Sequence, residues 1–264
     1  MPAPAIAFLT DFGTRDHYVG AMKGAALTIA PEATLVDITH GIAPQDILGG
    51  AIELRAAWRY FPPATIYVAV VDPGVGSPRR GLAARVGDHF FVAPDNGLLT
   101  LVFREVAPAA VVELVDPRFA LPVVSRTFEG RDRFAPAAAW LARGIALEAF
   151  GPAVHDWRTL PVPDPTVAGG RVTGEVLQVD TFGNLVTNIP AALVPVPAPG
   201  RRLDILVAGS RVPTLVDTYA SVPAGSLCAL VGSSGYLEVA VTGGNAAGDL
   251  GVGRGAVVSL TTRS

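Results

Sequence analysis

Acidic and basic side chains follow two apolar stretches of the N-terminal half, where they could act on a small molecule. Asp11 comes just after the apolar run 5–9, and Asp72 comes directly after the apolar run 65–71. Because ligands of an open α/β sheet bind beyond the carboxyl ends of its strands, Asp11 is placed where it could accept hydrogen bonds from a ribose diol. Arg79 lies seven residues after Asp72, and the intervening Pro-Gly-Val-Gly forces a tight loop that can fold an arginine back onto Asp72.

Each of these residues also has a plain structural interpretation. Asp11 can cap a turn or a helix N-terminus, and Asp72 can be a turn aspartate beside a surface pair, Arg79 and Arg80. The glycines after Asp72 do not form a phosphate-binding fingerprint, because the sequence has neither GxGxxG nor a Walker lysine.

Three further polar clusters are candidates of the same kind. Glu129 stands just before a predicted helix, where it is either a cap or a site residue. Asp180 and Asn184 flank Gly183, and together they offer acceptor and donor groups. Two Gly-rich loops, 233–236 with Ser233 and 243–247 with Asn245, add more polar groups, although ordinary turns contain the same residues.

Strand-like and helix-like stretches alternate through the first 150 residues. The pattern predicts an α/β domain with a mostly parallel sheet over residues 1–155. A short hairpin is expected between residues 85 and 93. The predicted strands are 5–9, 34–38, 65–71, 89–93 and 110–115, and the predicted helices are 18–30, 47–59 and 131–142.

The pattern changes after Phe150. Residues 151–170 contain four prolines and show weak periodicity, which predicts a linker over residues 156–170. From residue 171 to 264 the segments are short, rich in β-branched residues and interrupted by Gly or Pro, which indicates a smaller all-β domain, a barrel or a sandwich.

Composition excludes several classes of protein. Hydrophobic residues make up 50% and charged residues 16%, which excludes a disordered chain. The net charge of −3 argues against nucleic-acid binding, which needs a basic surface. No apolar run approaches a membrane span and no signal peptide is evident, so we expect a soluble cytoplasmic protein. The four histidines lack metal-ligand spacing, so no metal site is expected, and Cys228 is expected to be a buried structural thiol.

Taken together and in this order, the motifs resemble those of the S-adenosylmethionine (SAM) hydroxide adenosyltransferases, the SAM hydrolase family that is related to fluorinases and chlorinases. The resemblance runs from Phe-Leu-Thr-Asp-Phe-Gly at residues 8–13 to Asn-Ala-Ala at residues 245–247. It implies an N-terminal α/β domain, a C-terminal β-barrel and a homotrimer. SAM would lie between the N-terminal domain of one subunit and the C-terminal domain of its neighbour.

The resemblance also implies roles for single residues. Asp11 would hold the ribose hydroxyls, and Asp180 with Ser233 would hold the amino and carboxylate ends of the methionine part. The adenine contacts would come from Asn184, Asn245 and Ala247, with the ring of Tyr219 stacked on the base. Asp72, Arg79 and Glu129 match the residues that handle the attacking water.

Glu129 departs from the family pattern, because the family has His-Gly-Arg-Asp where this chain has Glu-Gly-Arg-Asp. Three interpretations follow. Glu129 replaces the histidine as a proton acceptor, or it pairs with Arg79 and weakens the electrostatic help of that residue, or it points away from the site. Asp72 stands where halogenases have Tyr, and the chain lacks the long insertion that fluorinases carry before the segment 93–97.

The predicted activity is therefore hydrolysis of SAM to adenosine and L-methionine by attack of water at C5′ of the ribose. SAM is the substrate, so no cofactor is expected. Two alternatives stay open at this point. One is a module that binds SAM or adenosine without turnover, and the other is a halide-dependent adenosyltransferase.

Overall fold

The computed structural model describes residues 4–196 and 202–263. The chain divides into two compact units, Met1–Leu160 and Pro161–Ser264. Residues 156–165, around the boundary, form no helix or strand.

A six-stranded sheet forms the centre of the first unit. Its strand order is β2-β1-β3-β5-β4-β6. The first four strands in this order are parallel to one another, and only β4 runs antiparallel to its neighbours. The mostly parallel α/β sheet expected from the sequence is therefore confirmed. The strands are β1 Ala5–Thr10, β2 Thr34–Thr39, β3 Ile66–Val70, β4 Gly81–Val86, β5 His89–Pro94 and β6 Ala110–Glu113.

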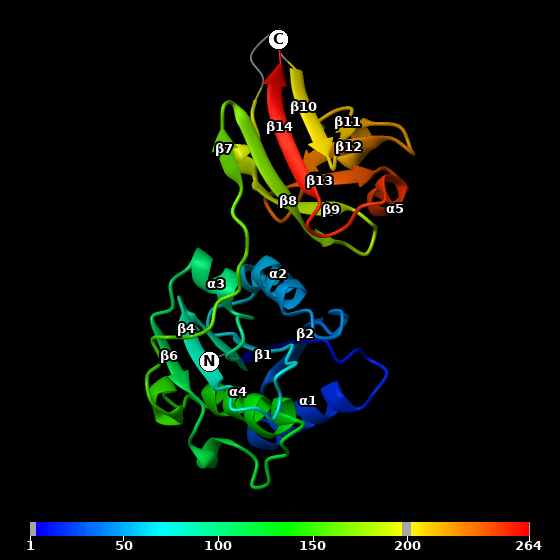
Figure 1. Cartoon of the computed structure of the whole chain (residues 1–264). Helices are drawn as coiled ribbons and strands as arrows, with labels where there is room; N and C mark the ends of the chain where they lie inside the picture. Colours follow the sequence, from blue (N-terminus) through cyan, green and yellow to red (C-terminus); the bar gives the residue numbers. More distant parts are fainter. Residues whose placement is uncertain (1–3, 197–201, 264) are drawn as a thin grey trace. The chain divides into compact units, whose positions relative to one another are not determined.

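Helices cover both faces of this sheet (Figure 1). Helices α1 and α4 pack together on one face, and α2 and α3 pack together on the other. β1 and β3 lie between these layers, and their sequences are apolar apart from Thr10 at the end of β1 and the hydroxyl of Tyr67, as expected for strands that are buried on both faces. The helices are α1 Tyr18–Ile29, α2 Ile47–Ala57, α3 Thr100–Glu105 and α4 Ala135–Ala142, and short 3-10 helices span Trp58–Tyr60, Pro117–Phe119 and Leu147–Phe150.

Two predicted helices differ from the observed ones. The predicted helix 47–59 ends as an α-helix at Ala57 and continues as a 3-10 turn. The predicted helix 131–142 begins with a π-helical turn, Gly130–Phe134, and becomes α-helical only from Ala135. π-turns often occur at functional sites, and this one directly follows Glu129.

The second unit is an antiparallel, nearly closed β-barrel with the strand order β11-β10-β14-β8-β9-β13-β12 and β7 paired to β8. After β11 the chain forms a bridge from Leu215 to Ala229 of β12, which brings the two ends of that order together. Cys228 is fully buried, as expected. The elements are β7 Thr166–Ala168, β8 Arg171–Val179, β9 Leu185–Pro190, β10 Arg202–Val207, β11 Ser210–Val212, β12 Leu227–Val231, β13 Tyr236–Val241, β14 Val257–Arg263, the helix α5 Ala246–Leu250 and 3-10 turns at Ala191–Leu193 and Tyr219–Ser221.

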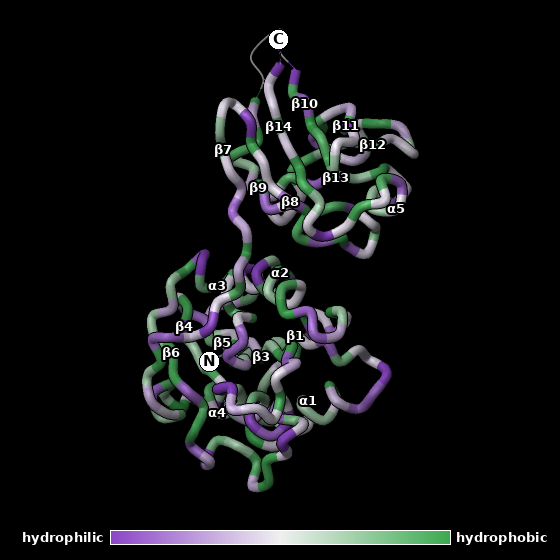
Figure 2. Tube along the Cα trace, in the orientation of Figure 1, coloured by the Kyte–Doolittle hydropathy of each residue, from purple (hydrophilic) through white to green (hydrophobic). Residues whose placement is uncertain are grey.

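Polar residues gather in the loops between these elements. The loop after β1 is hydrophilic at its tip (Figure 2), where residues 14–17 are exposed. Within the described ranges 4–196 and 202–263, no helix is both long enough and apolar enough to span a membrane.

Candidate active site

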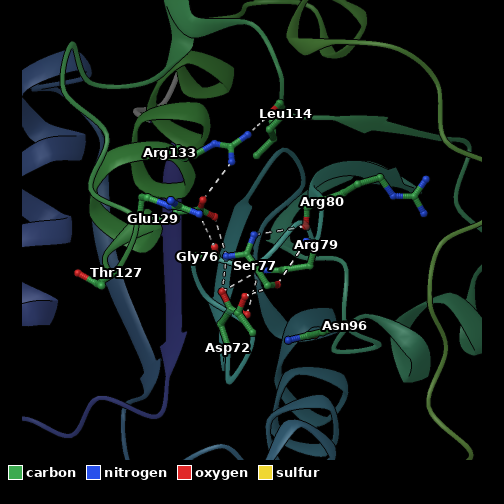
Figure 3. A network of polar contacts seen from close by, with 12 residues as sticks. Asp72, Gly76, Ser77, Arg79, Arg80, Asn96, Leu114, Thr127, Glu129 and Arg133 are labelled. Atoms are coloured by element: carbon green, nitrogen blue, oxygen red, sulfur yellow. Dashed lines mark hydrogen bonds and ion pairs between the residues drawn. The ribbon is translucent and has the colours of Figure 1, made fainter.

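Asp72 and Arg79 form a buried ion pair next to the carboxyl end of β3 (Figure 3). The Nε atom of Arg79 lies 2.9 Å from each carboxylate oxygen of Asp72, and its Nη2 atom also donates to Oδ2. Both side chains are only 4% exposed. The loop does fold Arg79 back onto Asp72, so the pair is not a surface feature.

Glu129 joins this pair from the segment before α4. Its Oε2 atom lies 2.6 Å from Nη2 of Arg79, and its Oε1 atom lies 3.2 Å from Nη1 of Arg133. Arg133 also donates to the backbone carbonyl of Leu114. Glu129 therefore does not point away from the site, and its side chain makes no helix-capping hydrogen bond. Asp72, Arg79, Glu129 and Arg133 alternate in charge, so the two carboxylates are balanced by two guanidinium groups.

The environment of Arg79 keeps it charged. Burial by itself lowers the pKa of this guanidinium, but hydrogen bonds and charges from Asp72 and Glu129 outweigh burial and raise the pKa overall. The guanidinium carbon also lies 5.3 Å from the ring centroid of Phe134, where a cation is attracted to the ring face. The site therefore holds a fixed positive charge between two carboxylates.

A close contact between two loops brings these residues together. Gly76 has a φ of +78°, and a Cβ atom there would lie 2.5 Å from the carbonyl oxygen of Arg126. Only glycine fits both the left-handed backbone and the short distance. The loop from Asp72 to Arg79 thus rests against the segment that leads to Glu129.

The neighbouring Arg80 belongs to a different cluster. Its guanidinium binds Asp95 at 2.7 Å and Asp156 at 2.7 Å. Arg79, and not Arg80, is therefore the arginine that faces Asp72. The sequence alone could not separate two adjacent arginines, because which one turns inward depends on the loop.

Asp11 lies at the carboxyl end of β1, at the same sheet edge as Asp72. Its Oδ2 atom accepts a hydrogen bond of 2.7 Å from the backbone N–H of Gln45. The next residue, Phe12, packs with its ring centroid 6.0 Å from that of Phe128. This aromatic contact connects the Asp11 loop to the segment that carries Glu129.

A polar network adjoins the turn that contains Asp11, and the predictions from the sequence did not include it. His40 is only 5% exposed. Its Nδ1 atom lies 2.8 Å from the hydroxyl of Thr10, and its Nε2 atom lies 2.9 Å from Asp37. Its carbonyl accepts from the backbone N–H of Gly13, so the network holds both ends of the Asp11 turn. The signal was an Asp and a His three residues apart at the end of a strand, next to the strand that leads to Asp11.

The candidates of the second unit gather around a cavity of about 640 Å³. Four of them line it: Asp180, Asn184, Tyr219 and Ser233. The carboxylate of Asp180 organises its own turn, since it accepts from the backbone N–H groups of Phe182 and Asn184 and from the Asn184 amide. Glu238 also lines the cavity, and no signal in the sequence marked it, because it stands inside an apolar strand pattern.

Asn245 and Ala247 do not line this cavity. Asn245 caps α5 by accepting a hydrogen bond of 2.7 Å from the N–H of Gly248. The N–H of Ala247 donates to the carbonyl of Gly183 at 2.9 Å. Both residues therefore support the turn between Asp180 and Asn184, which does contribute to the lining.

Taken with the fold, these sites define a two-domain protein with polar clusters at the carboxyl ends of parallel strands and in an appended β-barrel. Two family models match the chain: the SAM hydroxide adenosyltransferase N-terminal domain over residues 6–151, and the corresponding C-terminal domain over residues 174–259. The chain belongs to the SAM hydroxide adenosyltransferase family.

Curated relatives extend over the same length. A protein of Salinispora tropica named (R)-S-adenosyl-L-methionine hydrolase is 41% identical over 98% of each chain. A protein of the same name from Thermus thermophilus is 41% identical over 97% of this chain and 98% of its own. A fluorinase of an Actinoplanes species is 32% identical over 72% of this chain and 74% of its own.

Solved structures show the same fold. A conserved protein of Thermotoga maritima matches with a TM-score of 0.91 and 36% identity over 97% of this chain and 99% of its own. A conserved protein of Thermus thermophilus matches with a TM-score of 0.79 and 40% identity, over the same shares of the two chains.

Proposed function

We propose that this protein hydrolyses S-adenosyl-L-methionine to adenosine and L-methionine. The observation that carries the proposal is the buried cluster of Asp72, Arg79 and Glu129 at the carboxyl edge of the sheet. The near full-length relatives named (R)-S-adenosyl-L-methionine hydrolase support the same reaction.

In the proposed reaction, water attacks C5′ of the ribose in line with the sulfonium. A bond forms between the water oxygen and C5′, and the C5′–S bond breaks with its electron pair going to sulfur. Methionine leaves as a neutral thioether, and the proton of the water passes to Asp72 and then to solvent. Orientation of the water contributes much of the acceleration, and proton transfer to a positioned carboxylate adds to it.

Arg79 has two parts in this scheme. It fixes the orientation of the Asp72 carboxylate through two of its nitrogen atoms. It also stabilises the hydroxide character that develops on the attacking oxygen, because a fixed charge in a dry site acts more strongly than in water.

Glu129 stands at the position of the family histidine, and it is the second carboxylate, after Asp72, that pairs with Arg79. The negative charge of Glu129, taken alone, would offset the positive charge of Arg79. However, Arg133 binds the other carboxylate oxygen of Glu129 and balances this negative charge. Hydrolysis is therefore retained in this chain. Glu129 either takes up the proton or positions Arg79. The substitution Glu129→His distinguishes these roles, because the family histidine can still accept a proton but lacks the negative charge of Glu129 that binds Arg79.

The substrate contacts follow from the family resemblance. Asp11 binds the ribose hydroxyls, while Asp180 and Ser233 bind the methionine end. Asn184, Tyr219, Asn245 and Ala247 form the surroundings of the adenine, with SAM held between subunits of a homotrimer. No cofactor takes part. The lining of the second unit's cavity by Asp180, Asn184, Tyr219 and Ser233 supports this arrangement.

Two alternatives are less well supported. A halide-dependent transferase would need a halide beside the Asp72 carboxylate, which costs electrostatic energy in a buried site. The β4–β5 hairpin is short, as expected, and carries no long insertion. A binding module without turnover is not favoured, because the relatives that match nearly the whole chain are named hydrolases.

The test is incubation of the purified protein with SAM in ¹⁸O-labelled water, with and without chloride, followed by mass spectrometry of the products. Hydrolysis predicts adenosine labelled at the 5′ oxygen together with methionine, whether or not chloride is present. A 5′-chloroadenosine product would support the halide transferase. SAM that disappears only at its spontaneous rate would support the binding module, and Glu129→His would then be tested for recovery of turnover.

A further inference from the structure

The inner part of the polar network beside the Asp11 turn is closed to solvent. Thr10 is 0% exposed and His40 is 5% exposed. The Nε2 atom of His40 lies 2.9 Å from Oδ1 of Asp37, and its Nδ1 atom lies 2.8 Å from the hydroxyl of Thr10. That hydroxyl also accepts a hydrogen bond of 3.2 Å from the backbone N–H of Phe12. Because buried polar groups need hydrogen-bond partners, the hydrogens of this network can be assigned.

One tautomer of His40 satisfies both of its neighbours. If Nε2 carries the hydrogen, it donates to Asp37, and the bare Nδ1 accepts from the Thr10 hydroxyl. If Nδ1 carried the hydrogen instead, the bare Nε2 would face the carboxylate of Asp37. The hydroxyl hydrogen of Thr10 would then have no acceptor among the described residues. The hydrogen-bond network therefore assigns the neutral hydrogen to Nε2.

Lys23 removes the need for a second positive charge in this network. Its Nζ atom lies 2.6 Å from Oδ2 of Asp37. Burial by itself raises the pKa of Asp37, but hydrogen bonds from Lys23 and His40 outweigh burial and lower the pKa overall. The charge of this carboxylate is therefore already balanced by Lys23. An imidazolium at His40 would add a buried cation and would leave the Thr10 hydroxyl without an acceptor, and both changes cost free energy.

The Thr10 hydroxyl supports the turn on which Asp11 stands. Asp11 lies between Thr10 and Phe12, the two residues that this hydroxyl connects. The N–H of Gly13, the next residue of the turn, donates to the carbonyl of His40 at 2.8 Å. His40 therefore holds the turn through its backbone and, by way of Thr10, through its side chain. The Asp11 carboxylate accepts one bond from a backbone N–H, and a carboxylate can accept about four, so it keeps capacity for hydroxyl groups of a ligand.

We propose that His40 is a positioning residue for ribose recognition: its bare Nδ1 atom orients the Thr10 hydroxyl, and this hydroxyl fixes the turn that presents Asp11. The inference rests on the proposed function, in which Asp11 binds the ribose hydroxyls of SAM. His40 acts through Thr10 and does not itself contact the substrate. A binding contact that is equally strong in the ground state and the transition state lowers KM and leaves kcat unchanged. Loss of the Nδ1 acceptor should therefore appear in KM.

Two substitutions separate the two nitrogen atoms of His40. In His40→Asn the amide oxygen takes the place of Nδ1 and can accept from Thr10. In His40→Gln the amide nitrogen takes the place of Nε2 and can donate to Asp37, but the Thr10 hydroxyl loses its acceptor. We expect His40→Gln to raise KM for SAM about 10-fold, and His40→Asn to raise it less than about 3-fold, because only the first leaves a buried hydroxyl unsatisfied. Both kcat values should change little.

An analogue of SAM whose ribose lacks both hydroxyls identifies the part of the substrate that is affected. KM for this analogue should be the same in the parent protein, His40→Gln and His40→Asn, because it cannot make the contact with Asp11. Equal increases of KM for SAM and for the analogue would overturn the proposal, since His40 would then serve only to maintain the fold. A KM for SAM that rises as much in His40→Asn as in His40→Gln would overturn it as well.

Thr10→Val tests the same connection from its other end. It removes the hydroxyl and should raise KM for SAM as His40→Gln does. The double variant should be no worse than either single variant, because both remove one shared interaction. Thr65→Val is the matched control: Thr65 is 1% exposed, and its hydroxyl donates to the carbonyl of Pro62 before the start of β3, at the opposite edge of the sheet. This control should lose stability without a change in KM. Independent, additive increases of KM in the double variant would contradict the proposal.

The tautomer of His40 can be measured without a substrate. Nitrogen NMR of protein labelled with ¹⁵N in its histidines distinguishes a bare ring nitrogen from one that carries hydrogen. The chain has four histidines, and the signals of His40 are those that disappear in His40→Asn. We expect a bare Nδ1 and a hydrogen on Nε2 at neutral pH. A hydrogen on Nδ1 would overturn the proposal.

Calorimetric binding of SAM and of the analogue separates this proposal from the proposed function. If the protein binds SAM more tightly than the analogue, and His40→Gln reduces this preference about 10-fold, His40 supports ribose recognition even where no turnover occurs. If turnover occurs but the preference is the same in both proteins, the activity stands and the assignment of His40 is wrong.

Discussion

Asp72 and Glu129 share one arginine, but they are not equivalent. Asp72 contacts two nitrogen atoms of Arg79, whereas Glu129 divides its two oxygens between Arg79 and Arg133. Asp72 is also the carboxylate that directly follows a strand of the sheet, where ligands of α/β folds bind. At the scale of single residues, the proton acceptor is therefore expected to be Asp72.

Asp72→Asn should reduce kcat for adenosine formation about 100- to 10,000-fold, because an amide cannot accept the proton of the attacking water. The measurement is the steady-state rate of adenosine release. Asp156→Asn is the matched control, since Asp156 is a carboxylate that pairs with the adjacent Arg80 and is 83% exposed. An Asp72→Asn variant that hydrolyses SAM at the parent rate would show that the proton goes elsewhere.

At the scale of elements, the site depends on where two loops meet. The loop after β3 carries Asp72 and Arg79, and the segment before α4 carries Glu129. Their contact passes through Gly76, which lies against the backbone of Arg126. The helical turn that follows Glu129 is π-helical and contains Arg133, the second cation of the cluster.

Gly76→Ala should separate these loops, because the added Cβ would lie 2.5 Å from a backbone oxygen. We expect kcat to fall about 10- to 100-fold, since displacements of about 1 Å in a site have effects of this size. Gly87→Ala is the matched control. Gly87 also has a positive φ, +54°, but nothing lies within 4 Å of the added atom. Both variants should lose about 1–2 kcal/mol for the left-handed backbone, and only Gly76→Ala should lose activity. Equal activity losses in the two variants would contradict the loop contact.

β5 gives a prediction about pH and stability. His89 packs between the rings of Trp58 and Tyr67, and its Nδ1 atom is buried without a hydrogen-bond partner among the described residues. Burial lowers the pKa of His89, although the charge of Asp88 acts in the opposite direction. The imidazole of His89 is therefore protonated more readily in the unfolded chain than in the folded protein. The contribution of neutral His89 to the free energy of unfolding is complete above a pH of about 6.5 and is lost as the pH falls below that value.

We expect the thermal midpoint to decrease between about pH 7.5 and pH 5.5, and His89→Gln to make the decrease smaller. The exposed His155 provides the control, and His155→Gln should leave the slope unchanged. A slope that is identical in all three proteins would mean that His89 is not the group responsible.

At the scale of the whole molecule, the candidate residues belong to two separate compact units. The first contributes Asp11, Asp72, Arg79 and Glu129, and the second contributes the cavity that Asp180 lines. Neither set by itself offers both a water-activating cluster and a place for the methionine end. The proposed trimer resolves this, because each reaction site would combine the first unit of one subunit with the second unit of its neighbour.

Subunit mixing tests this arrangement. Chains with Asp72→Asn and chains with Asp180→Asn, each poorly active by itself, are co-expressed and purified together. If sites form between subunits, random assembly should give about a quarter of sites with both parts intact. The readout is adenosine formation per chain, with light scattering for the oligomeric state. Activity no higher than the mean of the two separate variants would indicate that each site lies within one chain.

Much of this protein was determined by its sequence. The apolar runs that end at Asp11 and Asp72 predicted buried parallel strands, because side chains buried on both faces must all be apolar. Alternation of strands and helices predicted the first unit, and short β-rich segments predicted the barrel. The loop Pro-Gly-Val-Gly predicted that an arginine returns to Asp72, since loop geometry of this kind is local.

Only the tertiary structure decided the rest. Whether Arg79 or Arg80 turns inward depends on partners far along the chain, Glu129 for the first and Asp95 for the second. Arg133 and Glu238 gave no signal of their own, because one lies in a helical turn and the other in an apolar strand. The role of Arg133 comes from the carboxylate of Glu129, which it binds. The role of Glu238 comes from the cavity that it lines. A sequence specifies the side chains, but the electrostatic environment of each one arises only when distant segments pack together.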